Sequence, residues 1–494
     1  YFPPFMGTLS CERGGRMPND DLNRSLAKNL SFLKETFGSS IDFYYKPFRV
    51  GQVRCCLAMF TGLSSPEKLT VMALSILEQE RIYFTDGSTL ADHLLTQSRI
   101  PTENAPIATR GELVQRLANG LAVFLIDGCC RAVAISTQEM PQRSVSTPDG
   151  EGNIHGPQEA FTELLRNNVS LLRRQFRTAS FVAEAHTART HARTEYCLCY
   201  DSACAAPDTV LAVRRELEQI ELPVLLDSTY FASFLKQDKL NLFPAAAYTI
   251  RPATACARLC EGKIVILVAG SPCAMIVPSF FAEHFECLDD YSSGAVFAGL
   301  IRLLKYLAFL LAVFGPGLYV LATTFAPELI PVRMLATLAL AEQQTPLPPM
   351  LEMLTVTLLL EIVREAGLRA PHSIGHTVSI VGALIIGETA VSAGIVSVPI
   401  LTMAAAATIA TLAVPSLYEQ SILFRFGVIL LTGLLGVPGL ACSAMMILAM
   451  ACGSEPFGYD YLYPLMPPGP ATWRDGFVRS IWSRLAKGGK IHET

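Results

Sequence analysis

The distribution of apolar residues divides the chain into two regions. Long apolar runs, typical of membrane helices, are concentrated between residues 303 and 452. Residues 1–295 instead alternate short apolar stretches with charged and turn-forming ones, as globular domains do. The pattern predicts an α/β or α+β soluble region in two lobes, followed by an all-α polytopic membrane domain.

Helical and strand patterns alternate through the first 295 residues. LNRSLAKNLSFLKETFG has apolar residues at helical spacing and stops at Gly38, whereas VRCCLAMFTGL is typical of a buried strand. A polar, turn-rich segment over 137–156 predicts a boundary between lobes. We therefore expect a disordered segment over 1–21, a first lobe over 22–150 and a second lobe over 151–295.

The apolar region, over 296–453, is expected to hold about four to six transmembrane helices. Residues 306–326 are long enough to cross a bilayer, although Gly315-Pro316-Gly317 should kink or break the helix. Residues 426–452 would extend about 40 Å as one helix, which exceeds a hydrocarbon core of roughly 30 Å. We expect GVPG, which begins at Gly436, to break this run.

The basic residues create a conflict in the expected orientation. Arg302 and Lys305 place the soluble region in the cytoplasm, and the basic tail over 454–494 is expected there too. Five crossings would put the tail outside. Either residues 426–452 re-enter without crossing, or the short glutamate-bearing stretch at 350–371 does not span.

Three carboxylates in the apolar region are candidate ion-pathway residues. Glu361 and Glu365 share a helix face, where Arg364 can relieve their repulsion, so they form either an interfacial salt-bridge cluster or a pathway of carboxylates. Glu388 lies within GALIIGETAVSAG, where an unpartnered charge is costly. It lies beside small residues that let helix backbones approach closely, namely Ala383, Gly387, Ala390 and Gly394.

Composition and motifs exclude several classes of function. The chain is 51% hydrophobic and 17% charged with a net charge of −4, which is too apolar for a fully soluble protein and gives no case for nucleic-acid binding. No phosphate-binding, nucleophile-elbow or zinc-protease motif occurs, so we assign no catalytic residue and no cofactor. One group comes closest to a metal site but lacks zinc-site spacing, so no metal is expected: His191, Cys197, Cys199 and Cys204.

Five separated stretches resemble one known family when taken in order. They are NLSFLKETFGSSIDF, HGPQEAFTELLRNNVSLLRRQF, FGPGLYVLATTFAPELIP, LEIVREAGLRAPHSIGHTVSIVGALIIGETAV and PFGYDYLYP. Over nearly its whole length the chain resembles the A-subunit family of bacterial spore germination proteins, the GerA family. The motif residues that match are Gly156, Pro157, Arg173, Arg174, Pro316, Arg364 and Glu365. The stretch TIRPA, beginning at Thr249, departs from the family's usual Thr-Glu-Arg-Pro-Asp. Ile250 and Ala253 stand where the family has its Glu and Asp, which puts in doubt the contact that these two carboxylates make.

This resemblance implies a multi-pass protein of the spore inner membrane, a cell membrane, with its soluble region on the cytoplasmic side. It implies B-type and C-type subunits as partners in a nutrient receptor, and a homo-oligomeric ring, expected to be a pentamer. The ring would conduct monovalent cations across the lipid bilayer, with Glu388 lining or flanking the path. Alternatively, Glu388 is protonated and hydrogen-bonded between packed helices.

Three further functions remain open at this point. An accessory A-like channel subunit would amplify ion release during germination without reading a nutrient itself. A proton-coupled transporter would use Glu388 as its carrier, although no inverted repeat is visible in the apolar half. A structural scaffold would dock partners without conducting ions.

Overall fold

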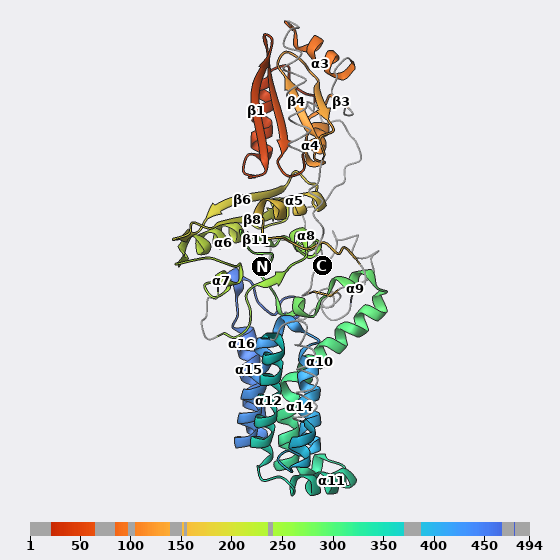
Figure 1. The fold of residues 1–494 in the computed structure, drawn as a ribbon, viewed down its shortest axis with the longest axis vertical. Coiled ribbons are helices and arrows are strands. Elements are labelled where there is room, and N and C mark those ends of the chain that lie inside the picture. The colour runs from red at the N-terminus through yellow and green to blue at the C-terminus, as the bar shows by residue number, and fades with distance from the viewer. Residues whose placement is uncertain are drawn as a thin grey trace. The chain divides into compact units, whose positions relative to one another are not determined.

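The computed structural model describes residues 21–64, 84–96, 104–138, 151–152, 156–235, 241–369, 387–466 and 479. These fall into two compact units (Figure 1). The first, which we call the sheet unit, contains the described residues up to Leu235 together with Ala246–Pro278. The second, the helical unit, contains the described residues of Lys236–Ala245 and Ser279–Leu485. Of the segment over 1–21 that was expected to be disordered, only Asp21 is described, and it forms a β-bridge with Thr109. Most of the basic tail also lies outside the described residues.

The first lobe of the sheet unit is a five-stranded antiparallel sheet in the order β1-β2-β4-β5-β3. Alternate residues of β2 point to opposite faces, with Cys56 and Ala58 on one face and Val53 and Cys55 on the other. Helices α1 and α4 cover the first face and α3 covers the second. The elements are α1 (Leu26–Phe37), β1 (Phe43–Val50), β2 (Val53–Phe60), α3 (Gly87–Thr96), β3 (Asn104–Ile107), α4 (Arg110–Ala118), β4 (Ala122–Ile126) and β5 (Ala132–Ile135).

The second lobe is another five-stranded antiparallel sheet, in the order β10-β12-β11-β8-β6, with α5 and α8 packed on one face. Its elements are α5 (Leu165–Gln175), β6 (Phe181–Thr187), β7 (Arg189–Thr190), β8 (Glu195–Asp201), α6 (Pro207–Gln219), β9 (Glu221–Leu222), α7 (Thr229–Ala232), β10 (Ala247–Thr249), α8 (Pro252–Cys260), β11 (Ile264–Val268) and β12 (Ala274–Val277). Two antiparallel sheets with helices on their faces confirm the predicted fold class, as its α+β form, for the N-terminal region.

A buried arginine on α5 joins the two lobes. Arg173 is fully buried, and its Nε and Nη2 donate to the two carboxylate oxygens of Asp42 at 2.8 and 2.9 Å. It also donates to Ser40 Oγ at 2.7 Å and to the Phe181 carbonyl at 3.0 Å. Asp42 and Ser40 precede β1 in the first lobe, so one side chain from the second lobe satisfies polar groups of both.

The helical unit is a bundle in which α10, α12, α14, α15 and α16 run side by side (Figure 1). Within the described residues, two helical segments are long and apolar enough to cross a membrane, Ala295–Thr324 and Pro415–Leu435. The elements are η1 (Phe281–Phe285), α9 (Leu288–Ser292), α10 (Ala295–Thr324), η2 (Pro327–Leu329), α11 (Val332–Glu342), α12 (Pro349–Arg369), α14 (Val398–Thr411), η3 (Pro415–Leu417), α15 (Tyr418–Leu435), α16 (Val437–Cys452) and η4 (Pro456–Gly458).

The last apolar run folds back on itself. Helix α15 ends at Leu435 and α16 begins at Val437, with Gly436 at φ +66° between them, so the predicted break in this run is confirmed. Ile447 of α16 shares a core cluster with Phe424 of α15 and with Phe285, just before α10. Helix α16 therefore runs antiparallel to α15 and returns to the end of the bundle at which α10 begins.

The role of Arg173 can be tested through hydrogen exchange at the lobe junction. The Ile41 amide donates to the Ala183 carbonyl at 2.8 Å across this junction, so its exchange reports whether the lobes stay docked. Arg173→Met leaves Asp42 buried without its partner, and we expect the free energy of unfolding to fall by about 3–5 kcal/mol. Exchange at Ile41 should accelerate accordingly in the purified protein.

Arg174→Met is the matched control, because Arg174 is the next residue on α5 and pairs with Glu159 near the surface. This variant should lower the free energy of unfolding by at most about 1 kcal/mol. Unchanged protection of Ile41 in Arg173→Met would contradict the role assigned to this arginine.

Candidate functional site

The polar centre of the helical unit is Arg425 on α15, whose side chain is fully buried. Its Nε donates to the Ala312 carbonyl of α10 at 2.7 Å, and its Nη2 donates to the Ala407 carbonyl of α14 at 3.1 Å. Thr411 Oγ1, also on α14, accepts a further hydrogen bond from Nη2. One guanidinium thus ties α10 and α14 to α15.

The contact with Ala312 explains how α10 passes through a proline. Pro316 has no N–H, so the carbonyl of Ala312, four residues earlier, loses its helical partner. Arg425 donates to that same carbonyl. Helix α10 runs from Ala295 to Thr324, so of the kink or break predicted at Pro316, the break does not occur.

The glycine after this proline allows close packing of α15 on α10. A Cβ built on Gly317 would lie 2.6 Å from Val428 Cγ1 of α15, which is closer than side chains approach. A larger residue at this position would force the Val428 side chain, or α15 itself, to shift. The reach of Arg425 from α15 to α10 therefore depends on the glycine as well as on the proline.

Glu361 of α12 is the carboxylate beside this arginine. Its Oε1 lies 3.7 Å from Arg425 Nη1, and its Oε2 accepts hydrogen bonds from Arg364 Nε at 3.3 Å and from the Tyr418 hydroxyl. The Arg364 guanidinium also lies over the Tyr418 ring, 3.5 Å from its centroid. A nearby carboxylate makes it less costly to hold Arg425 out of water.

Glu365 does not join this group, although it shares a helix with Glu361. Its half-exposed side chain pairs with Arg369 at 2.7 Å. Both glutamates thus form salt bridges within α12, as the interfacial salt-bridge alternative expects. Whether they also belong to an ion pathway stays a prediction.

A second buried carboxylate, Glu352 near the start of α12, was missed by sequence reasoning. It is fully buried and accepts the Ser397 amide at 2.5 Å and the Thr345 hydroxyl at 3.2 Å. Ser397 is the N-cap of α14, where a negative charge complements the helix dipole. The Ser-Val-Pro start of α14 was visible in the sequence, but nothing there pointed to a carboxylate 45 residues earlier.

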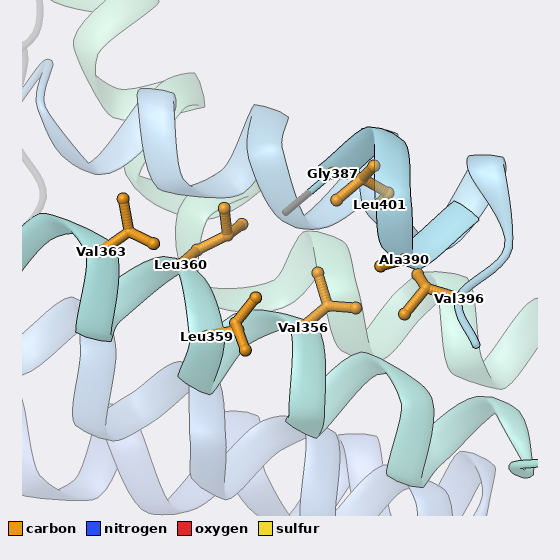
Figure 2. A pocket seen from close by; sticks show the side chains of 8 residues that line it. All are labelled: Val356, Leu359, Leu360, Val363, Gly387, Ala390, Val396 and Leu401. Atoms are coloured by element: carbon orange, nitrogen blue, oxygen red, sulfur yellow. The ribbon is translucent and has the colours of Figure 1, made fainter. Parts of the chain in front are cut away.

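The predicted pore-helix residues are placed on both sides of a short helical segment, residues 387–392. Gly387 and Ala390 line an apolar pocket between this segment, α12 and α14, as Figure 2 shows. Glu388 is exposed on the surface of the unit, and Gly394, at φ +67°, ends the turn that follows. Ala383 lies outside the described residues. The other pocket residues are Val356, Leu359, Leu360, Val363, Val396 and Leu401.

In the sheet unit, Arg251 binds the motif residue Pro157, and the motif residue Gly156 precedes it at φ +118°. This arginine is almost fully buried, and it donates to the Pro157 carbonyl at 2.8 Å and to the Glu151 carbonyl at 3.0 Å. The Glu151 carboxylate accepts the Ile250 amide at 3.0 Å. Although Ile250 and Ala253 replace the carboxylates of the family motif, Arg251 is hydrogen-bonded here to the Pro157 and Glu151 carbonyls. The Glu151 carboxylate also lies beside Arg251, at 3.8 Å.

Glu184 on β6 is the most strongly perturbed carboxylate described in the sheet unit. Hydrogen bonds from His186, then Tyr200, and the charge of Arg214 lower its pKa to about 2. The Tyr200 hydroxyl and Arg214 Nη2 lie 2.7 and 2.6 Å away. A carboxylate with so low a pKa is a poor general base at neutral pH.

Of the histidine and cysteine group noted in the sequence, only Cys197 and Cys199 belong to a hydrophobic core, whereas His191 is exposed. Cys197 and Cys199 lie buried on β8, with their Sγ atoms 3.8 Å apart. The hydrogen bond with Cys199, together with burial, keeps the pKa of Cys197 well above its ordinary value, so the thiol stays protonated at neutral pH. Across the described ranges, no group of three or more His, Cys, Asp or Glu side chains is placed to hold a metal.

Comparisons with known proteins agree on one family. Residues 31–490 match the family model described as Bacillus/Clostridium GerA spore germination protein. Spore germination protein KA of Bacillus subtilis (strain 168) is 31% identical over 93% of this chain and 85% of its own length. Spore germination protein B1 of the same organism is 29% identical over 93% and 95%.

One solved structure also aligns with the chain, the N-terminal domain of the A subunit of the Bacillus megaterium spore germinant receptor GerK3. The alignment covers 54% of this chain and 99% of that domain, at 22% identity and a TM-score of 0.42.

The pairing of Arg425 with the carbonyl freed by Pro316 predicts non-additive stabilities. Arg425→Met should cost about 3–5 kcal/mol of unfolding free energy, because it leaves the buried Ala312 carbonyl unpaired and removes the cation beside Glu361 Oε1. Pro316→Ala returns an N–H to the Ala312 carbonyl, so Arg425→Met should cost about 1–3 kcal/mol less in that background. The measurement is SDS-induced unfolding in detergent, followed by circular dichroism. Equal costs of Arg425→Met in the two backgrounds would refute the link between these residues.

Glu184 predicts a specific loss of stability in acid. Its folded-state pKa of about 2 lies below the ordinary value of 4.5, so the ionised form stabilises the fold above pH 4.5. That contribution disappears as the pH falls from 4.5 to about 2. Glu184→Gln should therefore flatten the decline of the unfolding temperature across this window. The same decline in both proteins would rule out this carboxylate as its source.

Proposed function

The chain belongs to the GerA family of spore germination proteins, and from this premise we propose that it is the A subunit of a spore germinant receptor. In this proposal several copies form a ring in the spore inner membrane, together with B-type and C-type subunits. Nutrient binding to the receptor opens the ring to monovalent cations, and their release triggers germination. The names of the relatives support the receptor role, since they are themselves called spore germination proteins.

The observation that carries the channel proposal is the exposure of Glu388. This carboxylate lies in an apolar segment, yet it is exposed and does not line the pocket to which Gly387 and Ala390 belong. Facing lipid, an ionised carboxylate would cost several kcal/mol. A neighbouring copy that covers this surface removes that cost, and a water-filled path between copies allows the carboxylate to stay charged and attract cations.

The charges inside one copy are poor candidates for the conducting path. Arg425 and Glu361 contact each other, and Arg425 also binds backbone carbonyls on two helices. Moving either charge would leave buried polar groups unpaired, which is costly. They therefore stabilise the packing of each copy, and we place the path between copies.

The course of the bundle is consistent with a cytoplasmic position for the soluble region and the tail. Helix α16 returns to the end at which α10 begins, so residues 295 and 452 lie at the same end of the bundle. Basic residues favour the cytoplasmic side for that end. This arrangement agrees both with the position of Arg302 and Lys305 and with the basic tail over 454–494, which each favour the cytoplasmic side.

The proposal predicts that Glu388→Gln lowers cation flux. The test uses vesicles that hold this chain with its B-type and C-type partners, and follows potassium efflux when a mixture of amino acids and sugars is added. Removing the negative charge should reduce efflux about tenfold and weaken the preference for cations over chloride.

Glu419→Gln serves as the control, because Glu419 is an exposed carboxylate in the first turn of α15 and is not one of the candidate ion-pathway residues. This variant should conduct like the wild type. Wild-type flux and selectivity in Glu388→Gln would exclude Glu388 from the path, and no efflux from the wild-type complex with any nutrient would contradict the channel.

A further inference from the structure

One face of α10 is apolar and exposed along most of the helix. The nine side chains on it are between 41% and 90% exposed. They are Val296, Phe297, Leu300, Leu303, Leu304, Leu307, Leu310, Leu311 and Leu318, and we call them the α10 stripe. The opposite face is buried against the rest of the helical unit, through residues such as Ala298, Phe309 and Val313.

The spacing of the α10 stripe is that of a coiled-coil seam. Phe297, Leu300, Leu304, Leu307 and Leu311 follow one another at alternating intervals of three and four residues, and Leu318 continues the seven-residue repeat. Side chains at this spacing insert between those of a second helix with the same repeat. The surface is therefore built to pack against a helix along its length.

Lipid cannot cover the first part of this stripe if α10 crosses the membrane, as the proposed function requires. Its 30 residues extend about 45 Å, whereas a hydrocarbon core of roughly 30 Å needs only about 20 of them. Arg302 is fully buried against Asp290, at 3.3 Å, and lies 3.7 Å from Glu286. Three such charges belong outside the hydrocarbon, so residues 295–304 protrude from it.

Binding to the membrane surface does not explain the protruding part either. An interfacial helix presents lysines and arginines to anionic headgroups. The two cations of α10 are engaged within the unit instead, since Arg302 contacts Asp290 and Lys305 donates to the Phe285 carbonyl at 3.2 Å. The face that carries the stripe holds no ionisable side chain over residues 296–318.

We propose that the α10 stripe packs against α10 of neighbouring copies of this chain and forms an interface of the ring. The stripe exposes on the order of 900 Å², comparable with the about 800 Å² per partner of a standard interface. Because the stripe is uncharged, identical copies meet there without repulsion. The proposal rests on the ring of the proposed function and locates one of its contacts.

The test is site-specific photocrosslinking of the full-length protein, purified in mild detergent. A benzophenone amino acid replaces Leu304 in the stripe or, as the control, Met445 on α16, which is 71% exposed. Illumination should link Leu304 variants into dimers and larger species, with the attached peptide mapping to residues 295–318 of another copy. The Met445 variant should stay near the background of the dark sample. Links from Leu304 to any other part of the chain, or none, would overturn the proposed interface.

Two charged variants and a chemical crosslinker separate failure of this interface from failure of the ring. Leu304→Glu should abolish the oligomers that glutaraldehyde fixes in the wild type, and Met445→Glu should leave them intact. Wild-type oligomers that persist in Leu304→Glu would reject the α10 contact and leave the ring standing. If glutaraldehyde yields only monomers of the wild-type protein, both the α10 contact and the ring are rejected.

Discussion

The structure of the helical unit depends on one buried guanidinium. Arg425 is held inside an apolar bundle, where an unpaired charge is not tolerated, so every neighbour must supply a partner. The partners come from separate helices: the Ala312 carbonyl on α10, two groups on α14 and the Glu361 carboxylate on α12. Because these partners must converge on one point, the arginine specifies a single packing of four helices, which apolar contacts alone specify less strictly.

The sheet unit uses the same principle at its own junction. Arg173 is also fully buried, and it binds Asp42 and Ser40 of the first lobe and the Phe181 carbonyl of the second. Its guanidinium lies over the Phe60 and Phe181 rings, 4.4 and 4.5 Å from their centroids. In both units, then, an arginine fixes how pieces that are far apart in the sequence fit together. For a protein whose proposed task is to open and close a path, such fixed junctions confine movement to the remaining contacts, which include those between copies.

Local patterns in the sequence predicted elements well where the pattern was strong. The end of α1 at Gly38, the buried strand β2 and the break at Gly436 are all confirmed. The strands β1 and β6 were missed. The sequence of β1, FYYKPFRV, does not alternate apolar and polar residues regularly, and that of β6, FVAEAHT, is apolar at only one end. The sequence predicted a kink or a break at Pro316, and the helix does not break there. The sequence could not show that the Ala312 carbonyl, which the proline frees, is bound by Arg425, 113 residues further along the chain. Glu352 was missed for the same reason, since its partner Ser397 belongs to another helix. The elements of the candidate site follow from local sequence, whereas the polar contacts that join them arise only in the folded chain.

The central claim is that the A subunit forms a ring and that the conducting path lies between copies. Native mass spectrometry of the wild-type protein, released from mild detergent, counts the copies directly. The account predicts one dominant closed oligomer, with five copies expected. A monomer that remains monomeric when its B-type and C-type partners are co-expressed would contradict the ring, and would leave Glu388 without a path to line.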